Sequence, residues 1–276
     1  MGYIDLHVHS TMSDGSLSPA ELVRYACEKG LTAFSLTDHN TVAGIPQAIN
    51  ESRHYPVRVI PGVEVTCAMG SRTLHILGYN IDYNDELFIA RLRNISQFKE
   101  EQNLKICSQM RTYGINIDYE QFREFTGCRT ITRDHFAAFL VASGHVDNIV
   151  QAYEKYLGKG RPCYIPERRI PAYNAVKMIL NAKGIPVLAH PKQYRLDENS
   201  YIQLFTILKS FGLKGIEAVF PTHTHEEEAM FSSIAENLGL FITGGSDFHG
   251  ALKPDTDLGT GKGNLMISQE LLNNLE

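Results

Sequence analysis

The sequence predicts an α/β fold in which seven strands close into an irregular barrel, interrupted by a helical insertion. Three observations support this fold class. Short apolar runs alternate with helix-like segments along most of the chain. Polar side chains able to bind metals repeatedly follow those runs, as expected for a site at the carboxyl ends of barrel strands. Residues 84–166, in contrast, contain no convincing strand.

Each element is expected from its own local signals. The expected strands cover residues 3–8, 32–37, 57–63, 73–79, 185–189, 214–219 and 240–244. Ser18 to Glu21 reads as a capping box with Pro at the first helical position, and Gly30 ends that helix. Helices are also expected over 171–183, before Gly184, and over 226–238, before Gly239. Alternating strands and helices favour a parallel sheet.

Three parts are therefore expected: barrel residues 1–83, an insertion at 84–166, and barrel residues 167–276. Helices are expected in the insertion at 87–113, 118–125, 132–142 and 148–156, and we interpret it as a flap over the barrel mouth. Between Arg129 and Lys177 there are eight Lys or Arg and four Asp or Glu, giving 8 − 4 = +4. A basic flap beside an acidic barrel suits an anionic substrate.

Composition limits the protein class. The 276 residues are 43% hydrophobic and 21% charged, with a net charge of −5, which argues against extensive nucleic-acid coating. The absence of an N-terminal leader pattern and of long apolar runs predicts a cytoplasmic protein without membrane contact. No obligate protein partner is evident. The five cysteines, expected to be reduced and buried, are Cys27, Cys67, Cys107, Cys128 and Cys163.

Nine potential metal ligands fall in short, separate cassettes. They are His7, His9, Asp14, His39, Glu64, His75, His190, Asp247 and His249. A lone histidine is usually a structural residue, but six of the eleven histidines fall in these cassettes. Imidazole and carboxylate suit Mn²⁺, Zn²⁺ and Fe²⁺. Nine ligands exceed the roughly three that one catalytic zinc uses, so two or three divalent ions are expected, in a hydrolase of phosphate esters.

The cassettes resemble the four motifs of the polymerase and histidinol phosphatase (PHP) family. The matching segments are Asp5-Leu6-His7-Val8-His9-Ser10, Thr37-Asp38-His39-Asn40, Gly62-Val63-Glu64, His190-Pro191 and Ser246-Asp247-Phe248-His249. The resemblance implies a distorted (β/α)7 barrel with a trinuclear centre. It implies one metal on His7, His9, Glu64 and Asp247; a second on Glu64, His75 and His190; and a third on Asp14, His39 and His249.

Further segments resemble one branch of that family, which acts on 3′,5′-nucleoside bisphosphates and on short RNA from its 5′ end. These are Arg129–His135, Tyr156–Gly160, Gly215–Thr224 and Gly244–Gly250. Asp134 departs from the branch pattern, which has Pro between the Arg and the His. The implied substrate is a phosphorylated nucleotide or short RNA, attacked by a hydroxide bridging two metals.

Residues outside the ligand set are assigned roles by their chemistry. Asp14 and Glu64 are expected to act in catalysis as metal ligands, and His223 as proton donor to the leaving oxygen. The candidate phosphate-binding residues are Arg133, His135, Lys159, Lys192 and His223. For the basic residues the alternative is a solvated surface charge. The candidates for stacking on a base, with the core as the alternative, are Tyr79, Tyr164 and Phe220.

Three other functions compete with this interpretation. Histidinol phosphate phosphatase shares the metal centre, but the helical insertion argues against it. A non-catalytic PHP module would lack some ligands, and here all nine are present. An amidohydrolase would normally bridge its metals with a lysine at a strand end. This sequence has no evident counterpart of that lysine, and Glu64 is expected to bridge the metals instead.

Overall fold

One continuous path of strands carries the fold in the computed structural model, which describes residues 2–127 and 129–276. The path runs β1-β2-β3-β4-β6-β7-β8. Its strands are β1 (Tyr3–Val8), β2 (Leu31–Leu36), β3 (Arg58–Met69), β4 (Arg72–Tyr79), β6 (Ile185–Leu188), β7 (Gly215–Val219) and β8 (Phe241–Gly244). All seven expected strands are present, and the α/β class with a helical insertion is confirmed.

The sheet is not wholly parallel, which corrects one expectation. β4 pairs antiparallel with both β3 and β6, whereas the other neighbours on the path are parallel. The reason is local: only Gly70 and Ser71 separate β3 from β4, and so short a link forms a hairpin rather than a helical crossover. An additional two-residue strand, β5 (Ile170–Pro171), pairs with the far end of β3.

The two ends of the strand path meet beside the ligand cassettes. An isolated bridge joins Val8 of β1 to Phe248, in the segment after β8. The His9 amide donates to the carbonyl of Phe248 at 3.0 Å, and the Phe248 amide donates to that of His7 at 3.4 Å. These bonds bring the cassette after β1 against the cassette after β8.

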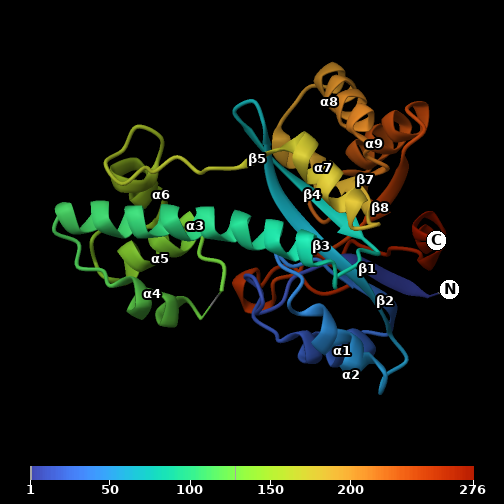
Figure 1. The fold of residues 1–276 in the computed structure, drawn as a ribbon, viewed down its shortest axis with the longest axis horizontal. Helices are drawn as coiled ribbons and strands as arrows, with labels where there is room; N and C mark the ends of the chain where they lie inside the picture. The colour runs from blue at the N-terminus through green and yellow to red at the C-terminus, as the bar shows by residue number, and fades with distance from the viewer. Residues whose placement is uncertain (1, 128) are drawn as a thin grey trace. The chain divides into compact units, whose positions relative to one another are not determined.

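Helices cover the sheet on two sides (Figure 1). On one side lie α1 (Pro19–Glu28) and α2 (Ile45–Ser52). On the other lie α7 (Ala172–Asn181), α8 (Glu198–Phe211) and α9 (His225–Asn237). The expected capping box is formed: Ser18 Oγ accepts from the Glu21 amide, and the Glu21 carboxylate accepts from the Ser18 amide at 2.8 Å. Local sequence thus fixes where α1 begins.

The chain divides into two compact units. The first comprises the residues up to Arg93 together with 170–276, and the second comprises 94–169. α3 (Glu86–Thr112) begins in the first unit and continues into the second, which also contains α4 (Tyr119–Thr126), α5 (Arg133–Ala142), α6 (Ile149–Ala152) and a π-helical turn, Tyr153–Leu157. The second unit has its own apolar core, which includes Phe122, Phe136 and Leu140.

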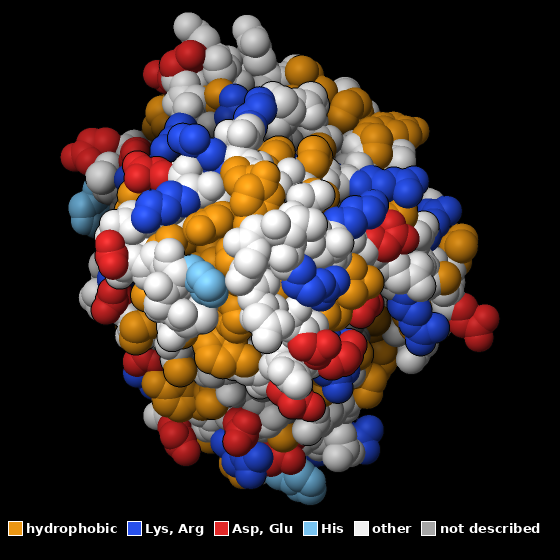
Figure 2. Space-filling view, turned by 90° about the vertical axis from the view of Figure 1, so that its left-hand side faces the viewer, with side chains coloured by type: hydrophobic (Ala, Val, Ile, Leu, Met, Phe, Trp, Pro, Cys, Tyr) orange, Lys and Arg blue, Asp and Glu red, His pale blue; other side chains and the backbone are white. Residues whose placement is uncertain are grey.

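Charged side chains are spread over the surface (Figure 2), and most of the described cysteines lie inside. In Figure 2, Lys and Arg side chains are interspersed with Asp and Glu over the face in view. Cys67, Cys107 and Cys163 are buried and Cys27 is half-buried, and none of these four cysteines forms a disulfide within the described residues. Cys128 lies outside the described residues. Within the described chain, no helix combines the length and the apolar character needed to span a bilayer.

Candidate metal centre

The strand ends position most of the predicted ligands. His7 lies near the end of β1 and His9 just beyond it, with both side chains fully buried. His39, His190, Asp247 and His249 follow β2, β6 and β8. Glu64 and His75 come instead from the middle of the β3–β4 hairpin, because β3 extends to Met69, beyond the expected end at residue 63.

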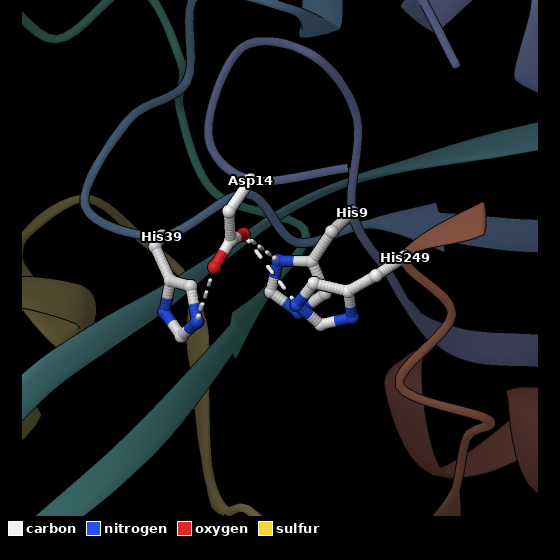
Figure 3. Close-up of side chains that lie close together, drawn as sticks. All are labelled: His9, Asp14, His39 and His249. Atoms are coloured by element: carbon white, nitrogen blue, oxygen red, sulfur yellow. Dashed lines mark ion pairs between the residues drawn. The ribbon is translucent and has the colours of Figure 1, made fainter. Parts of the chain in front are cut away.

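Asp14 organises a first group of ligands with three imidazoles (Figure 3). Its Oδ1 lies 3.6 Å from His9 Nδ1 and 3.4 Å from His249 Nε2. Its Oδ2 lies 3.7 Å from His39 Nε2. Each of the four residues offers one atom within 4.8 Å of the others. The group contains the three ligands that the family resemblance implies, with His9 added.

Asp247 and Glu64 form a second group with His7 and His9. Glu64 Oε2 lies 3.2 Å from His7 Nε2 and 3.3 Å from His9 Nε2. Asp247 Oδ1 lies 3.5 and 3.2 Å from the same two nitrogens. This group has the same four members as the first implied metal.

Glu64 also joins a third group through its other oxygen. Glu64 Oε1 lies 2.7 Å from His75 Nδ1 and 3.1 Å from His190 Nε2. Its Oε2 lies 3.1 Å from His39 Nδ1. One carboxylate thus faces five imidazoles, which is the arrangement expected of a ligand shared between ions.

Divalent cations fit these residues because the groups leave buried polar atoms without hydrogen bonds. Among the described residues, these atoms include His7 Nε2, both ring nitrogens of His9, Asp14 Oδ1, His39 Nδ1 and Glu64 Oε2. Buried polar atoms are normally satisfied, and leaving one unsatisfied is costly. Ion coordination would satisfy the whole set. The clusters are consistent with a site for several metal ions.

Charge in the centre favours ionised carboxylates. Burial raises the pKa of Glu64, but the imidazoles of His39, His75 and His7 outweigh it and hold the pKa well below its usual value. Burial lowers the pKa of His39 to about 3. Burial also acts to lower the pKa of His9, but the adjacent carboxylates of Asp247 and Glu64 raise it to about 9. Without metal, His9 therefore retains a proton at neutral pH.

Metal affinity should consequently increase with pH. A cation must displace a proton from His9 and another from His7. Burial acts to lower the pKa of His7, but the carboxylates of Glu217 and Glu64 hold it well above its usual value. Each displaced proton should contribute about a tenfold gain in affinity per pH unit, persisting to about pH 9 for His9. Chelator competition at pH 6.5, 7.5 and 8.5 tests this, and an affinity independent of pH would contradict it.

Comparison with known families identifies the fold that holds this centre. The PHP domain matches residues 5–182, more than half of the chain. This chain belongs to the PHP family.

The PHP protein is similar over most of its length to characterised hydrolases. It is 33% identical to a 5′-3′ exoribonuclease of Haemophilus influenzae, over 89% of each chain. It is 31% identical to a 3′,5′-nucleoside bisphosphate phosphatase of Chromobacterium violaceum, over 94% of this chain and 91% of that one. It is 30% identical to a phosphoribosyl 1,2-cyclic phosphate 1,2-diphosphodiesterase of Eggerthella lenta, over 89% and 94%. The PHP protein is a metal-dependent phosphoesterase.

A solved structure agrees with this assignment of the fold. It comes from Chromobacterium violaceum and is described as an amidohydrolase with bound sulfate and no metal. It is 31% identical to the PHP protein, with a TM-score of 0.81 over 94% of this chain and 90% of that one.

Three buried carboxylates that we did not predict as site residues accept hydrogen bonds from predicted ligands or from residues close to them. Glu217 Oε1 accepts from His7 Nδ1 at 2.9 Å, and its Oε2 accepts from the His190 amide at 2.7 Å. Asp38 accepts from the hydroxyls of Ser10 and Ser13, both at 2.7 Å. Asp5 accepts from the amides of Ser246 and Gly259 at 2.9 and 2.8 Å. For Asp5 in β1 and Glu217 in β7, the available signal was an acidic residue within a buried strand.

The predicted phosphate-binding residues of the PHP protein are divided between the units. Arg133, His135 and Lys159 belong to the second unit. There, Arg133 donates to the Ile165 carbonyl at 2.8 Å, and Thr132 donates its amide to His135 Nδ1 at 3.0 Å. Lys159 is exposed. Their roles toward substrate stay predictions.

In the first unit, Lys192 and His223 have defined partners. Lys192 Nζ donates to the Thr222 carbonyl and the Glu227 carboxylate, both at 2.6 Å. His223 Nδ1 donates to the Ala218 carbonyl at 2.6 Å, and the His223 ring lies 5.3 Å from that of Phe220. Of the candidates for stacking on a base, Tyr79 is fully buried in the core, which was the alternative expected for it.

Proposed function

We propose that this chain hydrolyses phosphate esters of nucleotides. The reaction would remove the 3′-phosphate of 3′,5′-nucleoside bisphosphates, cleave short RNA from its 5′ end, or do both. The observation that carries the phosphoester chemistry is the gathering of all nine predicted ligands around Asp14, Glu64 and Asp247. The nucleotide substrate is supported by relatives named for those two activities at 33% and 31% identity.

The ligand residues would hold two or three divalent ions. When bound, such ions lower the pKa of water and neutralise charge on a transferring phosphoryl group. Glu64 would contribute to more than one ion, and Asp14 and Asp247 would each hold an ion together with the imidazoles nearest to them. Glu217 would fix the ring of His7, because the Nδ1 proton of His7 is donated to it.

Other residues would bind the substrate and move a proton. Arg133, His135 and Lys159 are proposed to contact phosphate, as cations or hydrogen-bond donors. Lys192 is proposed to do so only if the substrate displaces Glu227 from its ammonium group. His223 is proposed to protonate the leaving oxygen, which requires a proton on Nε2 because Nδ1 donates to Ala218.

A substrate panel tests the proposed activity. Mn²⁺-loaded protein would be given adenosine 3′,5′-bisphosphate, a 5′-phosphorylated RNA trinucleotide and histidinol phosphate, with phosphate or mononucleotide release measured. We expect turnover of the bisphosphate or the RNA, abolished by Asp14→Ala. Turnover of histidinol phosphate alone would overturn the nucleotide proposal.

A second candidate is hydrolysis of a cyclic sugar phosphate. The relative named for phosphoribosyl 1,2-cyclic phosphate matches at 30% identity over 89% of this chain, nearly as well as the nucleotide enzymes. Adding a phosphoribosyl cyclic phosphate to the panel separates the two candidates. Turnover of this compound much faster than the bisphosphate and the RNA would favour the second candidate.

His223→Gln should slow hydrolysis of nucleotide esters about a hundredfold or more, because an alkoxide leaves poorly without a proton. p-Nitrophenyl phosphate should be affected only a few-fold, since nitrophenolate leaves unprotonated. Because burial lowers the pKa of His223 below its usual value, its protonated fraction and the rate it supports should fall at lower pH than for an ordinary histidine. His225→Gln is the matched control, because His225 is exposed. Equal losses on both substrates would remove His223 as the proton donor.

A further inference from the structure

A lysine outside every sequence motif contacts the centre. Lys253 Nζ lies 2.7 Å from Asp247 Oδ2, while Asp247 Oδ1 faces His7 Nε2 and His9 Nε2. Among the ion pairs of the described residues, it is the one in which a Lys or Arg meets a predicted ligand carboxylate. Its ammonium group therefore lies at the edge of the ligand cluster.

The loop that carries Lys253 is held in place by its backbone. The Ala251 amide donates to Ser16 Oγ at 2.8 Å, and the Lys253 amide donates to the Gly250 carbonyl at 3.0 Å. Gly250 has φ 64°, and a Cβ there would come within 2.0 Å of Ser16 Oγ. The turn thus requires glycine and fixes the start of the Lys253 side chain beside Asp247.

A cavity of about 390 Å³ opens beside this ion pair. Its lining includes Phe220, Thr222, Asp247, Lys253 and Lys262. Phe220 also contacts the ligand His190, with ring centroids 5.7 Å apart. The cavity therefore borders the ligand cluster at Asp247, and Phe220 in its wall packs against the ligand residue His190. Lys253 lines the cavity beside Asp247.

A cation in this position is unfavourable for metal binding by itself. Like charges repel, so the ammonium group of Lys253 opposes nearby divalent ions, and solvent reduces this repulsion only in part because 44% of the side chain is exposed. An anion held between the ammonium group and the ions would attract both, and would thereby offset the repulsion between them. Lys192 differs from Lys253 because its carboxylate partner, Glu227 at 2.6 Å, is not a predicted metal ligand.

We propose that Lys253 is a substrate-binding residue, which donates an N–H to a phosphate oxygen of the ester held at the metal centre. The ester would enter through the cavity lined by Phe220 and Lys262. The proposal rests on the phosphoester activity of the proposed function, but not on the identity of the nucleotide. Because an ammonium group has three N–H donors, Lys253 can bind phosphate while it still contacts Asp247.

Two affinities separate this role from a purely structural one. The affinity of the protein for Mn²⁺ would be measured by chelator competition, and that of the Mn²⁺-loaded protein for inorganic phosphate by calorimetry. Lys253→Met should raise the Kd for phosphate about tenfold or more, as for a lost hydrogen bond to a charged group. It should leave the affinity for Mn²⁺ equal or higher, because a repelling charge is removed. Lys253→Arg should restore phosphate binding in part.

Lys262→Met is the matched control, since Lys262 lines the same cavity without an ion pair to a predicted ligand among the described residues. It should change the Kd for phosphate less than Lys253→Met does. An unchanged Kd for phosphate in Lys253→Met would overturn the proposal. So would a loss of Mn²⁺ affinity restored by Arg, because Lys253 would then only position Asp247.

The proposal and the proposed function fail in different ways. If the wild-type protein turns over no nucleotide, yet binds phosphate in a manner that depends on Lys253, the nucleotide substrate is wrong and the role of Lys253 stands. If nucleotides are hydrolysed and Lys253→Met binds phosphate as the wild type does, the role of Lys253 is wrong and the proposed function stands.

Discussion

Glu64→Gln should empty the centre of metal and lower phosphoester hydrolysis by about a thousandfold or more, since bound ions supply several kcal/mol of transition-state stabilisation. The Glu64 carboxylate lies within 3.3 Å of nitrogens on His7, His9, His39, His75 and His190. Gln has the same shape, but it carries no charge and offers only one oxygen. Two ions can therefore no longer share the side chain.

Elemental analysis after gel filtration, together with initial rates, measures both effects. Glu226→Gln is the matched control, because Glu226 is exposed on the first turn of α9. The metal content of the control should equal that of the wild type. Full metal occupancy in Glu64→Gln would contradict the role of Glu64 as a shared ligand.

Glu217→Gln should weaken metal binding about tenfold to a hundredfold without touching any ligand, as is typical for partners of metal-binding histidines. Glu217 holds His7 through Oε1 and the His190 backbone through Oε2. An amide replaces one of these two acceptors with an NH₂ group, which cannot accept from either donor. It also removes the charge that favours a protonated Nδ1 on His7.

Titration with Mn²⁺ distinguishes this loss from misfolding. At saturating Mn²⁺, Glu217→Gln should recover most of its activity, whereas Glu64→Gln should not. Glu236→Gln, on the exposed face of α9, serves as the control. Wild-type metal affinity in Glu217→Gln would show that the bond to His7 does not position its ring.

Strand positions were predictable because apolar runs bounded by turn residues mark buried strands directly. Strand direction was not predictable in the same way. The hairpin from β3 to β4 turns within Gly70 and Ser71, and its long strands carry Glu64 and His75 in their middle rather than at a strand end. The register of paired strands, and not the strand signal, decides which of these side chains meet.

The ligand types were predictable because imidazoles and carboxylates stand out in short cassettes. The supporting residues were harder to predict, because their role depends on contacts between distant segments. Glu217 meets His7 across 210 positions of the chain, and Lys253 meets Asp247 through a turn that depends on Gly250 and Ser16. Sequence spacing alone does not indicate such contacts.

The nine predicted ligands are together expected to hold more than one ion. Protein saturated with Mn²⁺ and freed of excess by gel filtration can be analysed for metal per chain. We predict two or three ions for the wild type, falling by one in Asp14→Ala, since Asp14 organises the group of His9, His39 and His249. A single ion per chain, unchanged in Asp14→Ala, would contradict a centre that holds several ions.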